Sequence, residues 1–239
     1  MPAQHITLIG AGNMGTALVH GLIKAGFPAG AITAADSDPQ RVKTLKQAYG
    51  IHAAASNSAA VARCDLLVLA VKPQQMQQVL LEMKSAILHT FPVILSIAAG
   101  IRIAFIKQQL SEQVPVIRCM PNTPALIQAG ISALYAGNEL KPEARLLAET
   151  VVNAVGESLW LDNENQMDAV TALSGSGPAY FFYIMESLIQ AGMTLGLSEK
   201  QARQLCLQTS KGAAQLAMQS KQSLIKLRQQ VTSPGGTTE

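Results

Sequence analysis

A glycine-rich turn lies near the N-terminus, between a predicted strand and a predicted helix. An apolar run over residues 5–10 leads directly into the sequence GAGNMG at residues 10–15, and helical spacing continues over residues 13–26. Glycines in this setting allow a tight turn and let a pyrophosphate approach the N-terminus of the helix. The segment could be an ordinary strand-to-helix connection, but its context favours a dinucleotide-binding βαβ unit.

An acidic residue follows at the distance that such a unit requires. Asp36 ends the second predicted strand, about twenty residues beyond the glycines, where its carboxylate would accept hydrogen bonds from the adenosine ribose. A carboxylate there repels the additional phosphate of NADP, although Ser37 and Arg41 are close enough in sequence to weaken that preference. The alternative is that Asp36 or Asp38 caps the helix predicted to begin at Pro39.

Short apolar segments alternate with helical patterns as far as Trp160, which predicts a parallel sheet with crossover helices. After Trp160 the pattern becomes almost continuously helical. The predicted fold class is therefore α/β, with a Rossmann-type dinucleotide-binding domain at residues 1–162 and an all-helical domain at residues 163–239. We expect strands at residues 5–10, 31–35, 65–71, 92–97, 115–119, 131–135 and 157–161, and helices at 13–26, 39–49, 74–88, 141–154, 164–173, 178–195, 199–219 and 221–230.

The predicted helices at 178–195 and 199–219 carry few charges and have apolar residues on most sides. A surface helix of a monomer normally has one apolar face only. We therefore expect these helices to pack against a partner, most simply a second copy of the chain.

The composition limits the remaining classes of function. Hydrophobic residues make up 49% of the chain and charged residues 14%, as in globular proteins. The basic residues are scattered, so no nucleic-acid partner is predicted. Neither a signal peptide nor an apolar stretch of membrane-spanning length is expected, which predicts no membrane partner and a cytoplasmic location. Cys64, Cys119 and Cys206 are widely spaced without a metal-ligand pattern, so we expect reduced, mostly buried thiols and no metal.

Five further segments combine small or polar residues where predicted elements begin or end. Loops at the carboxyl ends of strands bind ligands in doubly wound sheets, and free backbone N–H groups at a helix start suit a carboxylate. Taken singly, each segment could equally be a turn, a linker or a capped helix. The segments are AVKP at 70–73, SIAAG at 96–100, MPNTP at 120–124, SGSGPAY at 174–180 and SPGGTTE at 233–239.

Together with GAGNMG, this ordered set resembles pyrroline-5-carboxylate reductase across essentially all 239 residues. The resemblance implies a Rossmann domain, a helical domain that interlocks with a partner subunit, and an active site at the interface of a homodimer or of a higher oligomer of dimers. It also implies reduction of 1-pyrroline-5-carboxylate to L-proline with NADPH or NADH as the cofactor.

The motif and the resemblance together assign the site residues. Cofactor-binding positions are Ile9, Gly10, Ala11, Gly12, Asn13, Met14, Gly15, Asp36, Ser37, Asn57, Ala70, Val71, Lys72, Pro73, Ala98, Ala99 and Gly100. Substrate-binding positions are Met120, Asn122, Ser233, Gly236, Thr237 and Thr238.

The chemistry that the resemblance implies needs little acid catalysis, because a protonated cyclic imine already has an electrophilic carbon. This agrees with the sequence, since the four histidines (His5, His20, His52 and His89) all lie outside the motifs. Thr238 is the catalytic candidate, as a hydrogen-bond partner of the ring nitrogen. A β-hydroxyacid dehydrogenase is the alternative enzyme, with Lys211 as the helical acid/base. Such a site requires an asparagine four residues later, but residue 215 is Gln. A non-catalytic nicotinamide-sensing protein is the rival of another class.

Three features depart from the family pattern. Asp36 stands where NADPH-using relatives often carry a small hydroxyl residue, so the family's NADPH preference is in question. Residues 220–224 lack the Glu and Pro that relatives usually place before the substrate loop. The sequence stops at Glu239, so the family's final helix is expected to be missing.

Overall fold

The computed structural model describes residues 4–137, 140–232 and 235–236. The chain divides into two compact units, residues 1–178 and residues 179–239. The first unit is an α/β domain built on one sheet with the strand order β3-β2-β1-β4-β5-β6-β7-β8. Its strands are β1 (Ile6–Ile9), β2 (Ile32–Ala35), β3 (His52–Ala53), β4 (Leu66–Leu69), β5 (Val93–Ser96), β6 (Val116–Met120), β7 (Gly130–Ala136) and β8 (Gly156–Trp160).

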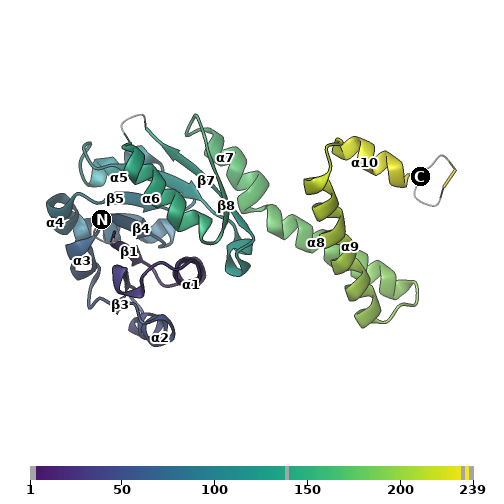
Figure 1. Ribbon diagram of the computed structural model, residues 1–239, viewed down its shortest axis with the longest axis horizontal. Coiled ribbons are helices and arrows are strands. Elements are labelled where there is room, and N and C mark those ends of the chain that lie inside the picture. The colour runs from purple at the N-terminus through teal and green to yellow at the C-terminus, as the bar shows by residue number, and fades with distance from the viewer. Residues whose placement is uncertain (1–3, 138–139, 233–234, 237–239) are drawn as a thin grey trace. The chain divides into compact units, whose positions relative to one another are not determined.

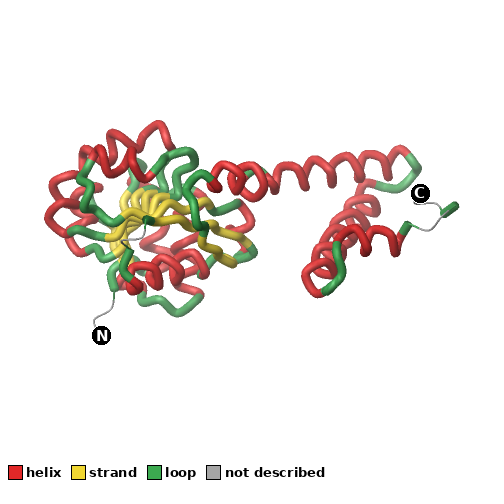
Figure 2. The backbone as a smooth tube through the Cα atoms, turned by 90° about the horizontal axis from the view of Figure 1, so that it is seen from above, coloured by secondary structure: helices red, strands yellow, loops and turns green. Residues whose placement is uncertain are grey.

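Helices cover both faces of this sheet (Figures 1 and 2). One apolar core lies beneath α1, α2 and α6, and a second lies beneath α3, α4 and α5. The central strand β4 contributes to both cores and is completely buried, which explains its uninterrupted apolar sequence LLVL. The helices of this unit are α1 (Asn13–Lys24), α2 (Pro39–Tyr49), α3 (Asn57–Ala60), α4 (Met76–Thr90), α5 (Ile103–Gln109), α6 (Pro142–Asn153) and α7 (Gln166–Val170).

The sequence pattern predicts a parallel sheet, but one pair of strands in the observed sheet is antiparallel. Strand β7 runs antiparallel to β6, whereas β8 returns parallel to β7 through α6. Only a 3₁₀-helical turn, Thr123–Ile127, lies between β6 and β7, and a parallel connection needs about a dozen residues or more. The short connection therefore imposes the antiparallel pairing.

Two expected helix starts are confirmed. Pro39 and Pro142 each occupy the first turn of a helix, where a missing N–H is tolerated. Asp38 is the N-cap of α2, and its side chain accepts a hydrogen bond from the backbone N–H of Gln40 at 3.0 Å. The elements that our expectations omitted are the short ones, β3, α3 and α5, which offer too few residues for a periodic pattern.

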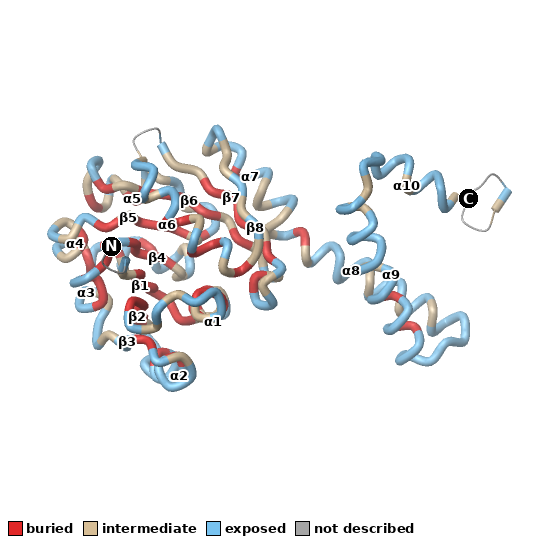
Figure 3. Tube along the Cα trace, in the orientation of Figure 1, coloured by how far each residue is buried: buried red, intermediate tan, exposed pale blue. Residues whose placement is uncertain are grey.

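The second unit consists of helices within its described residues. They are α8 (Gly177–Thr194), which begins in the first unit, α9 (Glu199–Gln219) and α10 (Leu224–Val231). Figure 3 shows α9 and α10 as mostly exposed. Large apolar side chains that are more than half exposed include Tyr180, Phe181, Phe182, Tyr183, Ile184, Leu188, Leu195, Leu205, Leu216, Met218, Leu224, Ile225 and Val231.

The domain boundary expected near residue 162 stays a prediction. By compactness alone, α7 still belongs to the first unit, because it contacts β7 and its Met167 is completely buried. Across the described part of the chain, the helices fall short of the length and apolar character that a membrane span requires.

Candidate functional site

The glycine-rich turn lies between β1 and α1, at the carboxyl edge of the sheet. Gly10 has a φ of +104°, and a Cβ at this position would collide with the carbonyl oxygen of Ala70, which follows β4. A Cβ on Gly15 would likewise collide with the carbonyl group of Gly10. Both positions therefore require glycine for the fold itself.

Gly12 differs from these two glycines, because the protein leaves space around it. The atom nearest to a Cβ at this position would be Nη1 of Arg41, at 3.8 Å. Gly12 is also the N-cap of α1, which has neither a side-chain cap nor an acidic residue in its first turn. The first N–H groups of the helix thus face open space, as an anion-binding helix N-terminus requires.

Asp36 joins the end of β2 to this turn. One carboxylate oxygen accepts a hydrogen bond from the backbone N–H of Ala11 at 2.6 Å, and the other accepts from the backbone N–H of Asp38 at 2.8 Å and the Ser37 hydroxyl at 3.5 Å. The helix cap is Asp38, so of the two acidic residues Asp36 is the one available at the dinucleotide turn. The side chain of Arg41 lies beside this turn and pairs with Asp38 at 3.4 Å.

The loops after β4 and β5 lie next to the glycine-rich turn. The backbone N–H of Ala70 donates to the carbonyl of Ile9 at 2.8 Å, and Lys72 is exposed. After β5, the Ala98 side chain is buried in the core, whereas Ala99 and Gly100 are exposed. Since the chain order reverses between β1 and β4, these loops flank the crevice in which doubly wound sheets bind ligands.

The remaining residues of the predicted cofactor site differ in how much of each residue is accessible to a ligand. Ile9 is buried in the core, so only its backbone is available. Asn57 begins α3, and its amide donates a hydrogen bond to Glu82 at 3.1 Å. Val71 and Pro73 are half-buried in the loop after β4, and Asn13 and Met14 lie in the first turn of α1.

The MPNTP loop meets the SGSGPAY segment inside the first unit. Asn122 accepts a hydrogen bond from the backbone N–H of Ile131 at 3.0 Å and donates one to the Ser174 hydroxyl at 3.3 Å. Met120 packs closely on Gly175, because a Cβ added to Gly175 would collide with the Cε atom of Met120. Ser174 and Gly175 belong to a π-helical turn, Thr171–Gly175, a conformation that is frequent at functional sites.

The predicted substrate loop is only partly described. Ser233, Thr237 and Thr238 lie outside the described residues. Gly235, with a φ of +71°, and Gly236 belong to the second unit. The substrate-binding and catalytic roles of this loop therefore stay predictions.

Two charged residues of the first unit were not among our candidates. Arg118 is almost completely buried on β6, and its Nη1 lies 3.1 Å from Oε1 of Glu164. The sequence signal for this pair was a basic residue within an otherwise apolar strand, VIRCM.

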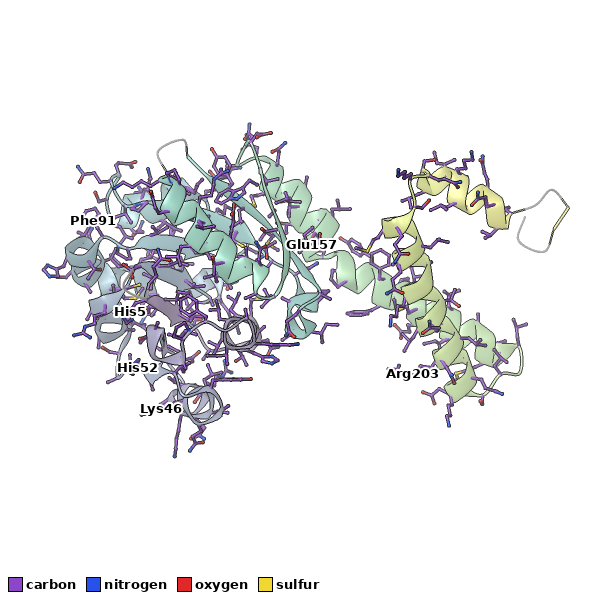
Figure 4. All side chains as sticks on the ribbon, in the orientation of Figure 1. His5, Lys46, His52, Phe91, Glu157 and Arg203 are labelled. Atoms are coloured by element: carbon purple, nitrogen blue, oxygen red, sulfur yellow. The ribbon has the colours of Figure 1, made fainter. Side chains whose placement is uncertain are left out.

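The described cysteines and histidines offer no activated nucleophile. All three cysteines are free and buried, and burial raises the pKa of both Cys64 and Cys119 to about 12, so both are neutral thiols at physiological pH. His5 directly precedes β1 and His52 is the first residue of β3; both are labelled in Figure 4. His20 stacks on Tyr49 with ring centroids 5.9 Å apart.

Comparison with known proteins identifies relatives over the whole chain. Residues 164–239 match the family model described as pyrroline-5-carboxylate reductase dimerisation, and residues 5–100 match the one described as NADP oxidoreductase coenzyme F420-dependent. The pyrroline-5-carboxylate reductase of Pseudomonas aeruginosa is 46% identical over 100% of this chain and 87% of its own length. That of Pasteurella multocida is 38% identical over 100% of this chain and 88% of its own length.

Two solved structures are similar along almost the entire chain. A pyrroline-5-carboxylate reductase from Coxiella burnetii superimposes with a TM-score of 0.92 at 39% identity, covering 99% of this chain and 87% of that one. A pyrroline carboxylate reductase from Plasmodium falciparum, solved with NADP bound, gives a TM-score of 0.86 at 29% identity, covering 100% and 87% of the two chains.

Proposed function

Because the chain belongs to the pyrroline-5-carboxylate reductase family, we propose that it reduces 1-pyrroline-5-carboxylate to L-proline with NADPH or NADH. The observation that carries this function is the open N-terminus of α1 at Gly12, flanked by Asp36 and by the loops after β4 and β5. These residues fit a dinucleotide, since they offer N–H groups to a pyrophosphate and a carboxylate to a ribose. The direct test is oxidation of NADH or NADPH when 1-pyrroline-5-carboxylate is added.

The chain's own part in the reaction is to orient the reactants. The residues around Gly12 and Asp36 would hold the nicotinamide cofactor, which would supply hydride-donating chemistry when bound. The backbone of residues 236–238 holds the substrate carboxylate, and Thr238 forms a hydrogen bond to the ring nitrogen as it becomes an amine. Met120 and Asn122 line the substrate side, where the Asn122 amide is fixed because it accepts a hydrogen bond from the Ile131 N–H and donates one to the Ser174 hydroxyl. Orientation of two bound reactants can by itself supply a large part of a rate enhancement.

We propose a cytoplasmic location for this activity. It is supported by the three cysteines, which are free and buried, as is usual for proteins of reducing compartments.

The active form is expected to be at least a homodimer. The second unit exposes rows of large apolar side chains along α8 and α9, and a monomer seldom leaves so much apolar surface in water. The match of residues 164–239 to a dimerisation family supports the same assignment. Sedimentation velocity at micromolar concentration should give the mass of a dimer or of a multiple of it. A well-folded monomer under these conditions would contradict the shared-site arrangement.

The cofactor preference should depend on Asp36 and Arg41. We expect usable activity with NADH, because the Asp36 carboxylate can accept a hydrogen bond from a free ribose 2′-hydroxyl and repels a 2′-phosphate. Arg41 is the cation beside the same turn, so Arg41→Ala should lower kcat/KM with NADPH by about tenfold and leave NADH almost unaffected. The measurement is kcat/KM for both cofactors.

Asp36→Ser is the complementary variant in this comparison. It should shift the preference towards NADPH, because the repulsion of the 2′-phosphate is removed while a hydroxyl remains. A large NADPH preference in the wild type that persists in Asp36→Ser would show that this carboxylate does not select the cofactor.

A further inference from the structure

A buried ion pair joins the core of the sheet to the segment that precedes α7. Arg118 on β6 is 4% exposed, and its partner Glu164 is 19% exposed, so water screens the pair weakly. The guanidinium and Oε1 of Glu164 are 3.1 Å apart, and Asp168 contributes a second, more distant carboxylate at 3.9 Å. A buried guanidinium without an anion is strongly unfavourable, so the pair fixes where the segment lies.

Glu164 connects strand β6 to the start of α5, which follows the loop after β5. The same Oε1 atom accepts a hydrogen bond from the backbone N–H of Ile103 at 3.0 Å, at the start of α5. Ile103 follows shortly after Ala99 and Gly100, which lie in the loop after β5. Arg102 strengthens this connection with a hydrogen bond to Asn165 at 3.0 Å. One carboxylate oxygen therefore holds the start of α5, just after the loop that follows β5, and the middle of β6 together.

Both sides of this connection lead to predicted site residues. Arg118 stands two positions before Met120 on the same strand, and the segment fixed by Glu164 continues through α7 into the π-helical turn. Within that turn, Ser174 accepts the hydrogen bond from Asn122, and Gly175 packs on Met120. A shift of the 164–168 segment would therefore move the cofactor side and the substrate side of the site relative to each other.

We infer that Glu164 is a positioning residue for hydride transfer, acting through Ile103 on the loop after β5 and through Arg118 on strand β6 and the loop that follows it. This inference rests on the proposed reductase function. It concerns a residue that touches neither reactant, so its effect should appear in the rate of the hydride step and not in cofactor affinity.

Single-turnover kinetics separates positioning from a purely structural role. An equimolar complex of enzyme and NADPH, at a concentration well above the dissociation constant, is mixed with excess 1-pyrroline-5-carboxylate, and the loss of the bound reduced cofactor is followed. The rate constant reports the hydride step, whereas the amplitude reports the fraction of competent enzyme. Glu164→Ala should lower the rate constant about tenfold, with the amplitude and the dissociation constant for NADPH within twofold of the wild type.

Two conservative variants keep the test decisive if Glu164→Ala folds poorly. Glu164→Gln retains an oxygen that can accept from both Arg118 and Ile103, and should recover most of the rate constant. Arg118→Lys keeps the charge but loses the planar guanidinium, and should lower the rate constant about threefold to fivefold. The matched control is Glu157→Gln on β8, an exposed glutamate labelled in Figure 4, which should leave both quantities unchanged.

The outcomes distinguish this inference from the proposed function. If the wild type does not oxidise NADPH or NADH with 1-pyrroline-5-carboxylate, the proposed function is wrong. If the wild type is active and the Glu164 and Arg118 variants lower only the amplitude, with a wild-type rate constant, then the pair supports the fold alone and the positioning role is refuted.

Discussion

Gly12→Val is expected to remove almost all cofactor affinity while leaving the protein folded. The space beside Gly12 contains no protein atom nearer than Arg41 Nη1 at 3.8 Å, so the fold itself can accept a side chain. That side chain would fill the position from which a pyrophosphate reaches the first N–H groups of α1. Loss of two hydrogen bonds to a charged phosphate, at about 1.5–3 kcal/mol each, weakens NADPH and NADH binding about a hundredfold or more.

Cofactor titration and thermal unfolding of the same preparations test this prediction. Valine is a poorer N-cap than glycine, so a small loss of stability, about 1 kcal/mol, is expected. The control is Gly15→Ala, whose Cβ would collide with the backbone of Gly10 and should lower the unfolding temperature of the protein more than Gly12→Val does. If Gly12→Val bound NADPH like the wild type, α1 would not be the pyrophosphate site.

Thr238→Ala is expected to lower kcat/KM for 1-pyrroline-5-carboxylate about tenfold to a hundredfold. The reason is the loss of one hydrogen bond to a charged or developing polar group, at about 1.5–3 kcal/mol. Residue 238 is remote in sequence from the glycine-rich turn, so affinity for NADPH should stay nearly unchanged. Steady-state kinetics with a parallel cofactor titration measures both quantities.

The hydroxyl itself is tested by two further variants. Thr238→Ser retains the hydroxyl and should restore most of the activity. Thr232→Ala removes a hydroxyl of the same type that donates to the Arg228 carbonyl in its own helix, so kcat/KM should hardly change. If Thr238→Ala stayed within twofold of the wild type, the loop would act through its backbone alone.

Local sequence patterns determined the longer elements of the fold and the glycine-rich turn between β1 and α1. A glycine-rich turn after a buried strand, a proline in the first turn of α2, and the apolar run of β4 each depend on residues that are neighbours in the chain. Their conformational preferences act over a few residues, so the pattern can be read without the fold. The same reasoning identified α8 and α9 as helices with unpartnered apolar surface.

Tertiary structure alone decided which polar groups meet. The hydrogen bond from Ala11 to Asp36, the contact of Asn122 with Ser174, and the Arg118–Glu164 pair join residues that are far apart in sequence. The periodicity of the sequence does not predict these contacts. Arg118 within an apolar strand, for example, indicates only that a buried charge needs a partner. The path of the chain after β8 decides which carboxylate pairs with Arg118. Because α7 packs on β7, Glu164 lies within reach of the guanidinium.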